Sequence, residues 1–114
     1  MNIEDLRNSC LEFRSVTEDI KWGNNLVFSV AGKIFCLADL DPPLSVALKV
    51  PEEDFDELTT HSGISQAPHF ARRQWISISE GNTLTDHEWQ QLLKQSYDLV
   101  VAKLPKRERQ ELGR

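Results

Sequence analysis

Residues 26–39 read LVFSVAGKIFCLAD, and this stretch indicates a sheet-forming segment. Two runs rich in Val, Ile, Phe and Leu, residues 26–31 and 33–39, stand on either side of Gly32. Short runs of β-branched and aromatic residues around a glycine are typical of antiparallel strands. Gly23-Asn24-Asn25 supplies turn chemistry just before the first run. The stretch therefore predicts a β-hairpin or meander.

Helical patterns lie at both ends of the chain. Apolar residues recur at three- and four-residue steps within residues 3–13, which predicts an amphipathic helix capped by Asn2. A long C-terminal helix is predicted to begin at Thr85, which can form a capping box with Glu88. Pro105 is expected to end this helix, and the charged tail after it is expected to fray or to form a brief helical turn.

The middle of the chain predicts shorter elements. Residues 45–50 alternate apolar and polar, which indicates a strand with one solvent-facing side. Pro51 and the carboxylates after it indicate the start of a short helix that Gly63 would end. Residues 65–70 are expected to form a loop, and residues 75–78 another strand. These elements predict one α+β domain spanning residues 1–114.

Composition favours a soluble cytosolic protein. The 114 residues suit a single hydrophobic core. The polar, acidic N-terminus does not resemble a secretory signal, and no apolar run is long enough for a membrane span. Cys10 and Cys36 form no CxxC pair and lie in apolar segments, so we expect two buried free thiols.

No motif for catalysis or metal binding is present. His61, His69 and His87 are too far apart in sequence to suggest a zinc site, and neither a nucleophile motif nor a glycine-rich phosphate loop occurs. We therefore expect a binding protein without cofactor or metal rather than an enzyme. The acidic residues 52–57 leave one alternative open, a site for a hard cation, although a solvated helix start explains the same residues.

Net charge is −5, which disfavours a polyanionic partner, but bases outnumber acids after residue 66. In the run Arg72-Arg73-Gln74-Trp75, guanidinium groups can grip phosphates and an exposed indole can stack on an unpaired base. The competing interpretation packs Trp75 in the core and leaves both arginines solvated. Lys103 belongs to a second basic group, at the end of the long helix, where stabilisation of the helix dipole is the competing explanation.

Several strings of the sequence follow one another in a familiar order. They are VTEDIKWG at 16–23, GKIF at 32–35, PLSVALK at 43–49, RQWI at 73–76 and SYDLVVAKLP at 96–105. Together they resemble the MmcQ/YjbR family over nearly the whole chain. The resemblance implies a frataxin-like (CyaY-like) fold, in which helices cover one side of an antiparallel sheet. It also implies a proposed DNA-binding role through a double-wing arrangement of β-hairpins.

The resulting hypothesis is a non-catalytic, cytoplasmic domain that binds nucleic acid, with DNA as the partner. No association with a membrane is expected. Its contacts to nucleic acid are assigned to Lys21, Lys33, Lys49, Arg72, Arg73, Trp75 and Lys103. An alternative is a pocket that uses the same basic and aromatic positions for a small anion or a protein partner. A third possibility is an enzyme that uses His69 or a carboxylate in a cleft.

Overall fold

The computed structural model describes residues 1–114 and confirms an α+β fold. The strands are β1 (Val16–Lys21), β2 (Asn25–Val30), β3 (Lys33–Asp39), β4 (Ser45–Lys49), β5 (Ile64–Gln66) and β6 (Trp75–Ser79). The helices are α1 (Ile3–Leu11), α2 (Glu52–Leu58), α3 (Asp86–Ala102) and α4 (Lys106–Glu111). No helix has the length and apolar character that crossing a bilayer requires.

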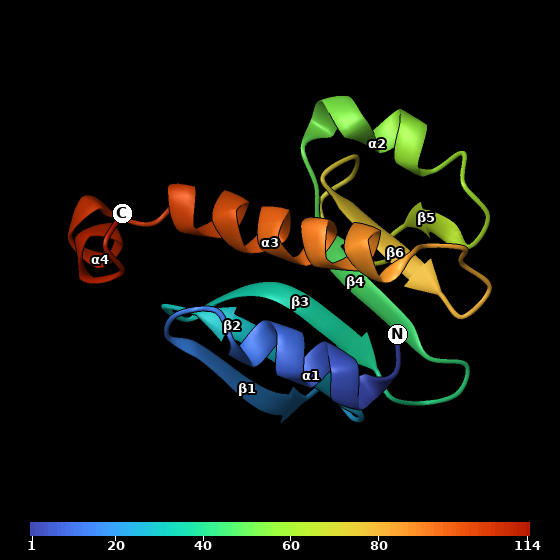
Figure 1. The fold of residues 1–114 in the computed structure, drawn as a ribbon, viewed down its shortest axis with the longest axis horizontal. Helices are drawn as coiled ribbons and strands as arrows, with labels where there is room; N and C mark the ends of the chain where they lie inside the picture. The colour runs from blue at the N-terminus through green and yellow to red at the C-terminus, as the bar shows by residue number, and fades with distance from the viewer.

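The strands form one antiparallel sheet in the order β1-β2-β3-β4-β6-β5 (Figure 1). The first four strands follow one another in the chain. β6 lies between β4 and β5, because the chain after β4 passes through α2 to the edge strand β5 and then returns as β6. This order makes β1 and β5 the two edge strands.

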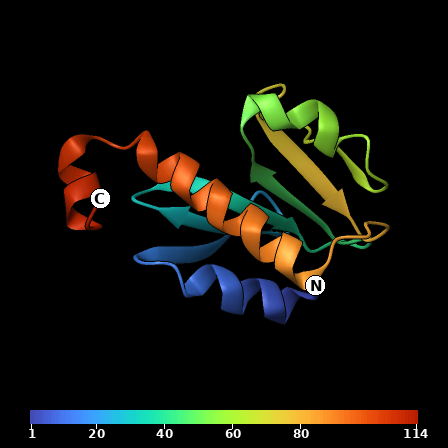
Figure 2. The same cartoon turned by 45° about the horizontal axis from the view of Figure 1, so that its top comes forward.

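Helices cover only one face of this sheet. α1 and α3 lie side by side across it, as the two views in Figures 1 and 2 show. The main core fills the space between these two helices and the sheet. It includes four fully buried residues, Phe28, Phe35, Leu48 and Leu93. We call the opposite side of the sheet the open face, since α1 and α3 leave it uncovered.

Local signals placed most of these elements correctly. α3 begins with the predicted capping box, in which the Thr85 hydroxyl accepts a hydrogen bond from the Glu88 backbone and Glu88 accepts one from the Thr85 backbone. The charged tail forms α4. Two predictions were wrong in detail: α2 ends at Leu58, well before Gly63, and the short strand β5 at residues 64–66 overlaps the start of the loop expected at residues 65–70.

A buried serine joins α3 to the sheet. The β3–β4 ladder ends at the pair Cys36 and Leu48. Just beyond it, the Ser96 hydroxyl accepts a hydrogen bond from the Lys49 backbone N–H at 2.9 Å and donates one to the Phe35 carbonyl at 2.6 Å. Ser96 is fully buried. One side chain of α3 therefore replaces a missing rung between the two central strands.

The edge strand β1 is largely exposed and carries charged residues. Within it, the Asp19 carboxylate accepts a hydrogen bond from the Ile20 backbone N–H at 2.8 Å. Arg7 of α1 forms an ion pair with Glu18, and this pair lowers the pKa of the Glu18 carboxyl through the Arg7 hydrogen bond. β1 is thus attached to the domain by α1 as well as by β2.

Candidate functional site

Cross-strand partners point to the same side of a sheet, so the strand registers arrange the open face in rows. One end row is polar and consists of Lys21, Asn25, Asp39, Ser45 and Ser79. The middle row consists of Asp19, Val27, Leu37, Ala47 and Ser77. At the other end, Ile34, which precedes Leu37 in β3, lies opposite Ser29, and Lys49 lies opposite Trp75. The open face is therefore polar at one end of its strands, whereas the other end carries an aliphatic residue, an indole and a lysine.

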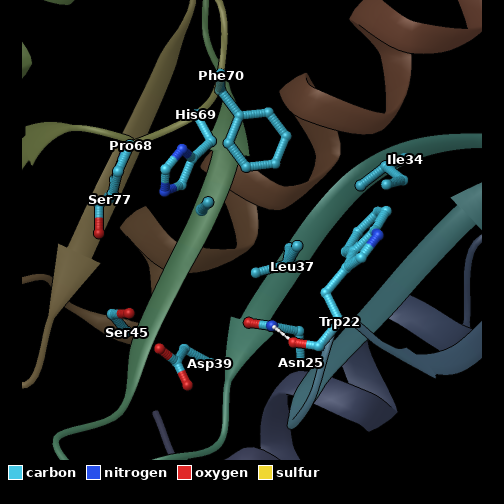
Figure 3. Close-up of a pocket in the computed structure, with 11 residues that line it drawn as sticks. Trp22, Asn25, Ile34, Leu37, Asp39, Ser45, Pro68, His69, Phe70 and Ser77 are labelled. Atoms are coloured by element: carbon cyan, nitrogen blue, oxygen red, sulfur yellow. Dashed lines mark hydrogen bonds between the residues drawn. The ribbon is translucent and has the colours of Figure 1, made fainter.

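A groove of about 540 Å³ lies on this face. Leu37 and Ala47 contribute to its floor. In Figure 3, Trp22 and Ile34 lie on one side of the groove, and His69 and Phe70 lie on the other. The groove therefore combines an apolar floor with rings on both sides, brought together from β3, β4, the β1–β2 turn and the β5–β6 loop.

Trp22 is the most exposed large apolar residue of the chain, with 66% of its surface accessible. It occupies the β1–β2 turn with a left-handed backbone (φ 48°), and the Asn25 side-chain amide donates to its carbonyl at 2.8 Å. The Lys21 ammonium lies 5.8 Å from the centroid of the indole, close enough for a cation–π contact. The turn therefore presents an aromatic ring and a cation together.

Trp75, in contrast, is buried and belongs to a small second core on the open face. Its ring stacks on Phe70 at 4.3 Å between centroids, and Ala47 and Ala67 complete the cluster. The β5–β6 loop is tied over this cluster by Gln66, whose side-chain oxygen accepts a hydrogen bond from the Arg73 backbone N–H at 2.8 Å. Trp75 supports the groove wall through Phe70 and has little free surface for a base.

Five of the six predicted cationic residues lie toward one end of the sheet. Lys33 begins β3 and Lys49 ends β4, and antiparallel pairing brings these ends together. Arg72 and Arg73 precede β6, whose first residue pairs with Lys49. Lys103, at the C-terminal end of α3, is close enough for its charge to act on Lys49. Lys21 lies apart, at the other end of β1.

The Lys49 ammonium is partly buried and lies near another cation. Partial burial, followed by repulsion from Lys103, lowers the pKa of the Lys49 ammonium. Neither lysine takes part in an ion pair. An arriving anion would relieve the repulsion, so this end of the face favours negative charge.

Arg73 differs from the other predicted cations because carboxylates neutralise it. Its guanidinium donates two hydrogen bonds of 2.9 Å to Asp56, and it lies 3.8 Å from Glu52. The hydrogen bonds from Arg73, and then its charge, lower the pKa of the Asp56 carboxyl. Part of the acidic run 52–57 is therefore engaged in holding the β5–β6 loop against α2.

Acceptor groups at the polar end of the groove were not foreseen from the sequence. Asp39 lines the groove there with Ser45 and Ser77, and its carboxylate accepts a hydrogen bond from the Asp41 backbone N–H at 3.0 Å. Phe70 was also missed because it lay in a predicted loop. The alternation within residues 33–39 was the available signal for Asp39, since it places Asp39 on the same face as Leu37.

The structure brings no group of three or more His, Cys, Asp or Glu side chains into a metal-binding arrangement. His69 is exposed at the groove wall, with a left-handed backbone (φ 69°). No nucleophile or carboxylate makes a hydrogen bond to its ring. The arrangement offers stacking surfaces, hydrogen-bond acceptors and nearby cations.

Comparisons with known proteins gave one family match and several matches among solved structures. A YjbR sequence model matches residues 11–99. The Deinococcus radiodurans protein DR2400, whose crystal structure is described as containing the domain DUF419, is 31% identical with a TM-score of 0.89 over 98% of this chain and 88% of that one. A Pseudomonas syringae protein, as a crystal structure, is 22% identical with a TM-score of 0.75 over 87% of this chain and 98% of that one. No curated protein matches the chain.

Proposed function

The chain belongs to the YjbR family, and on this premise we propose that it is a non-catalytic domain that binds nucleic acid, DNA in particular, through the open face of its sheet. Lysines and arginines at the rim contact phosphates, and the β1–β2 turn and the β5–β6 loop flank the bound strand as two wings. The proposal includes a cytoplasmic location.

One observation carries this proposal. The cations toward this end of the sheet that carry no ion pair are Lys33, Lys49, Arg72 and Lys103. Lys49 lies on the open face, whereas Lys33 and Lys103 reach this end from the covered side. These cations come from four separate segments of an acidic chain, and repulsion between two of them is left uncompensated. Phosphate oxygens are the partners that such a cluster suits, because each contact releases a condensed counterion.

The acidic net charge does not oppose local binding. The carboxylates of Asp56 and Glu52 are already held by Arg73 on the side of α2. Asp39 lies at the other end of the groove. Electrostatic attraction is screened within about 8 Å at physiological ionic strength, so acidic groups farther away have little effect on a phosphate at Lys33 or Lys49.

A second candidate function is the binding of a small ligand or of a protein side chain in the groove. The observation that favours it is the groove itself, whose volume of about 540 Å³ lies in the usual range for ligand pockets and whose lining contains no lysine or arginine. A neutral ligand would need none of the rim cations. The two functions therefore differ in their response to salt.

Anisotropy titrations of labelled single-stranded and duplex DNA at several salt concentrations test the proposal. Saturable binding at low salt is expected, with log affinity falling by about 0.7 to 0.9 for each phosphate contact as log salt rises. Lys33→Gln combined with Lys49→Gln should lower affinity about tenfold and reduce the slope by about 1.4 to 1.8. Lys94→Gln, which removes one charge from the exposed side of α3, is the control and should change little.

Absence of saturable binding at low salt would refute nucleic-acid binding. Because the double variant removes two charges and the control removes one, a loss in log affinity only twice that of Lys94→Gln would show that only overall charge matters. Binding that is insensitive to salt, with a response in tryptophan emission, would favour the small-ligand candidate.

A further inference from the structure

The two ends of the groove differ in chemistry, and this difference suggests what it holds. The polar end offers acceptors: the Asp39 carboxylate and the Ser45 hydroxyl. Figure 3 shows the Asn25 amide nitrogen bound to the Trp22 carbonyl, which leaves the amide oxygen free to accept. A ligand that fits this end must supply hydrogen-bond donors. The middle of the groove, between Trp22 and the rings of the opposite wall, accepts a flat apolar body.

The opposite end leads to a cation. On β4, Lys49 follows Ala47 by two residues on the same face, which places it about 7 Å farther along the strand. On β3, Lys33 lies opposite Val30 of the main core, so it points to the covered side of the sheet and not into the groove. A molecule lying along the strands would therefore have its donor end at Asp39, a flat ring above Leu37 and an anionic end near Lys49.

We infer that the groove accommodates one unpaired base bearing an exocyclic amino group, with its amine at Asp39 and its backbone phosphate at the Lys49 end. This inference rests on the proposed function and deepens it from nucleic acid in general to a single strand. Cytosine, adenine and guanine carry such an amine, whereas thymine and uracil present carbonyl oxygens that the Asp39 carboxylate would repel. Ring stacking on Trp22 supplies the rest of the recognition.

A base inside a duplex cannot make these contacts. Both of its faces are stacked on neighbouring base pairs, and its pairing edge is occupied by the opposite strand. Entry into the groove requires a base that is already unpaired or that leaves the stack at an energetic cost. The groove therefore selects single strands over duplexes of the same sequence.

The test compares oligodeoxycytidine with oligodeoxyuridine of equal length, which differ in the base edge but not in charge. Unmodified protein should bind the cytidine strand about tenfold more tightly, as expected for one charge-assisted hydrogen bond per bound base. Asp39→Asn should bring the two affinities within about twofold, mainly by weakening cytidine binding. Asparagine keeps an oxygen for the Asp41 N–H, so the local fold is retained.

Asp41→Asn is the matched control, because Asp41 is exposed, lies two residues after Asp39 and is outside the groove. It should keep the tenfold preference. Trp22→Ala provides a second, independent variant at an exposed position and should weaken both strands about tenfold through lost stacking.

The possible results distinguish the inference of a bound base from nucleic-acid binding in general. Equal, saturable affinities for the two strands, or tighter binding of a duplex, would overturn the base inference and leave nucleic-acid binding standing. Loss of the preference in Asp41→Asn as well would overturn it too, because a general charge effect would then explain the data. If neither strand nor duplex binds at low salt, both proposals fail.

Discussion

Ser96→Ala tests the bridge between α3 and the two central strands. The change removes one oxygen atom and leaves two buried backbone groups, the Lys49 N–H and the Phe35 carbonyl, without their partner. Each unsatisfied buried group costs about 1 to 3 kcal/mol. We therefore expect a loss of about 3 kcal/mol in the free energy of unfolding, which corresponds to a fall of about 12 °C in Tm for a domain of this size.

Urea unfolding followed by circular dichroism measures the free energy, and amide hydrogen exchange locates the effect. The Lys49 amide should exchange much faster in the variant than in the unmodified protein. Ser29→Ala is the control, because Ser29 lies half-buried on the open face and its side chain makes no hydrogen bond. Its effect should stay within about 0.5 kcal/mol. A Ser96→Ala variant as stable as this control, with unchanged exchange at Lys49, would refute the bridge.

Three further predictions concern stability and reactivity. Gly63→Ala should be strongly destabilising in thermal melts, because Gly63 has a left-handed backbone and the new Cβ would lie 2.6 Å from a backbone nitrogen. Gly32→Ala, at another left-handed position, meets no atom within 4 Å and should cost only about 1 to 2 kcal/mol. The Cys36 thiol should resist disulfide-exchange reagents at pH 8 until the protein unfolds, because its hydrogen bond with the Cys10 thiol and its burial raise its pKa. Rapid labelling of the native protein would contradict this. The contribution of Glu18 and Asp56 to stability should be constant above their ordinary carboxyl pKa values of 4.5 and 3.8, respectively, and should be lost as the pH falls below them, because both groups have lowered pKa values in the folded state. A melting temperature that rises on acidification would refute this.

The elements that were predictable from sequence carry their signals locally. α3 combines a capping box at Thr85 with a continuous apolar stripe, and the hairpin of β2 and β3 is marked by Gly32 between two apolar runs. Such signals need no knowledge of distant residues. β1 lacked them because an edge strand with exposed, charged residues on both faces has no apolar alternation to detect.

The candidate site was only partly predictable for a related reason. Basic residues are visible in any sequence, so Lys33, Lys49 and Lys103 could be named. Whether a cation is free depends on residues far away in the chain, and Asp56 neutralises Arg73 across 17 positions. The groove itself joins Trp22 to Phe70, which only the strand order brings to the same face.

The two outer strands also bear on behaviour at high concentration. β5 presents only three residues of backbone, and along β1 a carboxylate of the strand itself already occupies the Ile20 N–H. Short edges and charged edge residues are the features by which natural sheets avoid joining to copies of themselves. Sheet extension into fibrils is therefore disfavoured at both borders, and concentrated samples should remain dispersed without engineered changes.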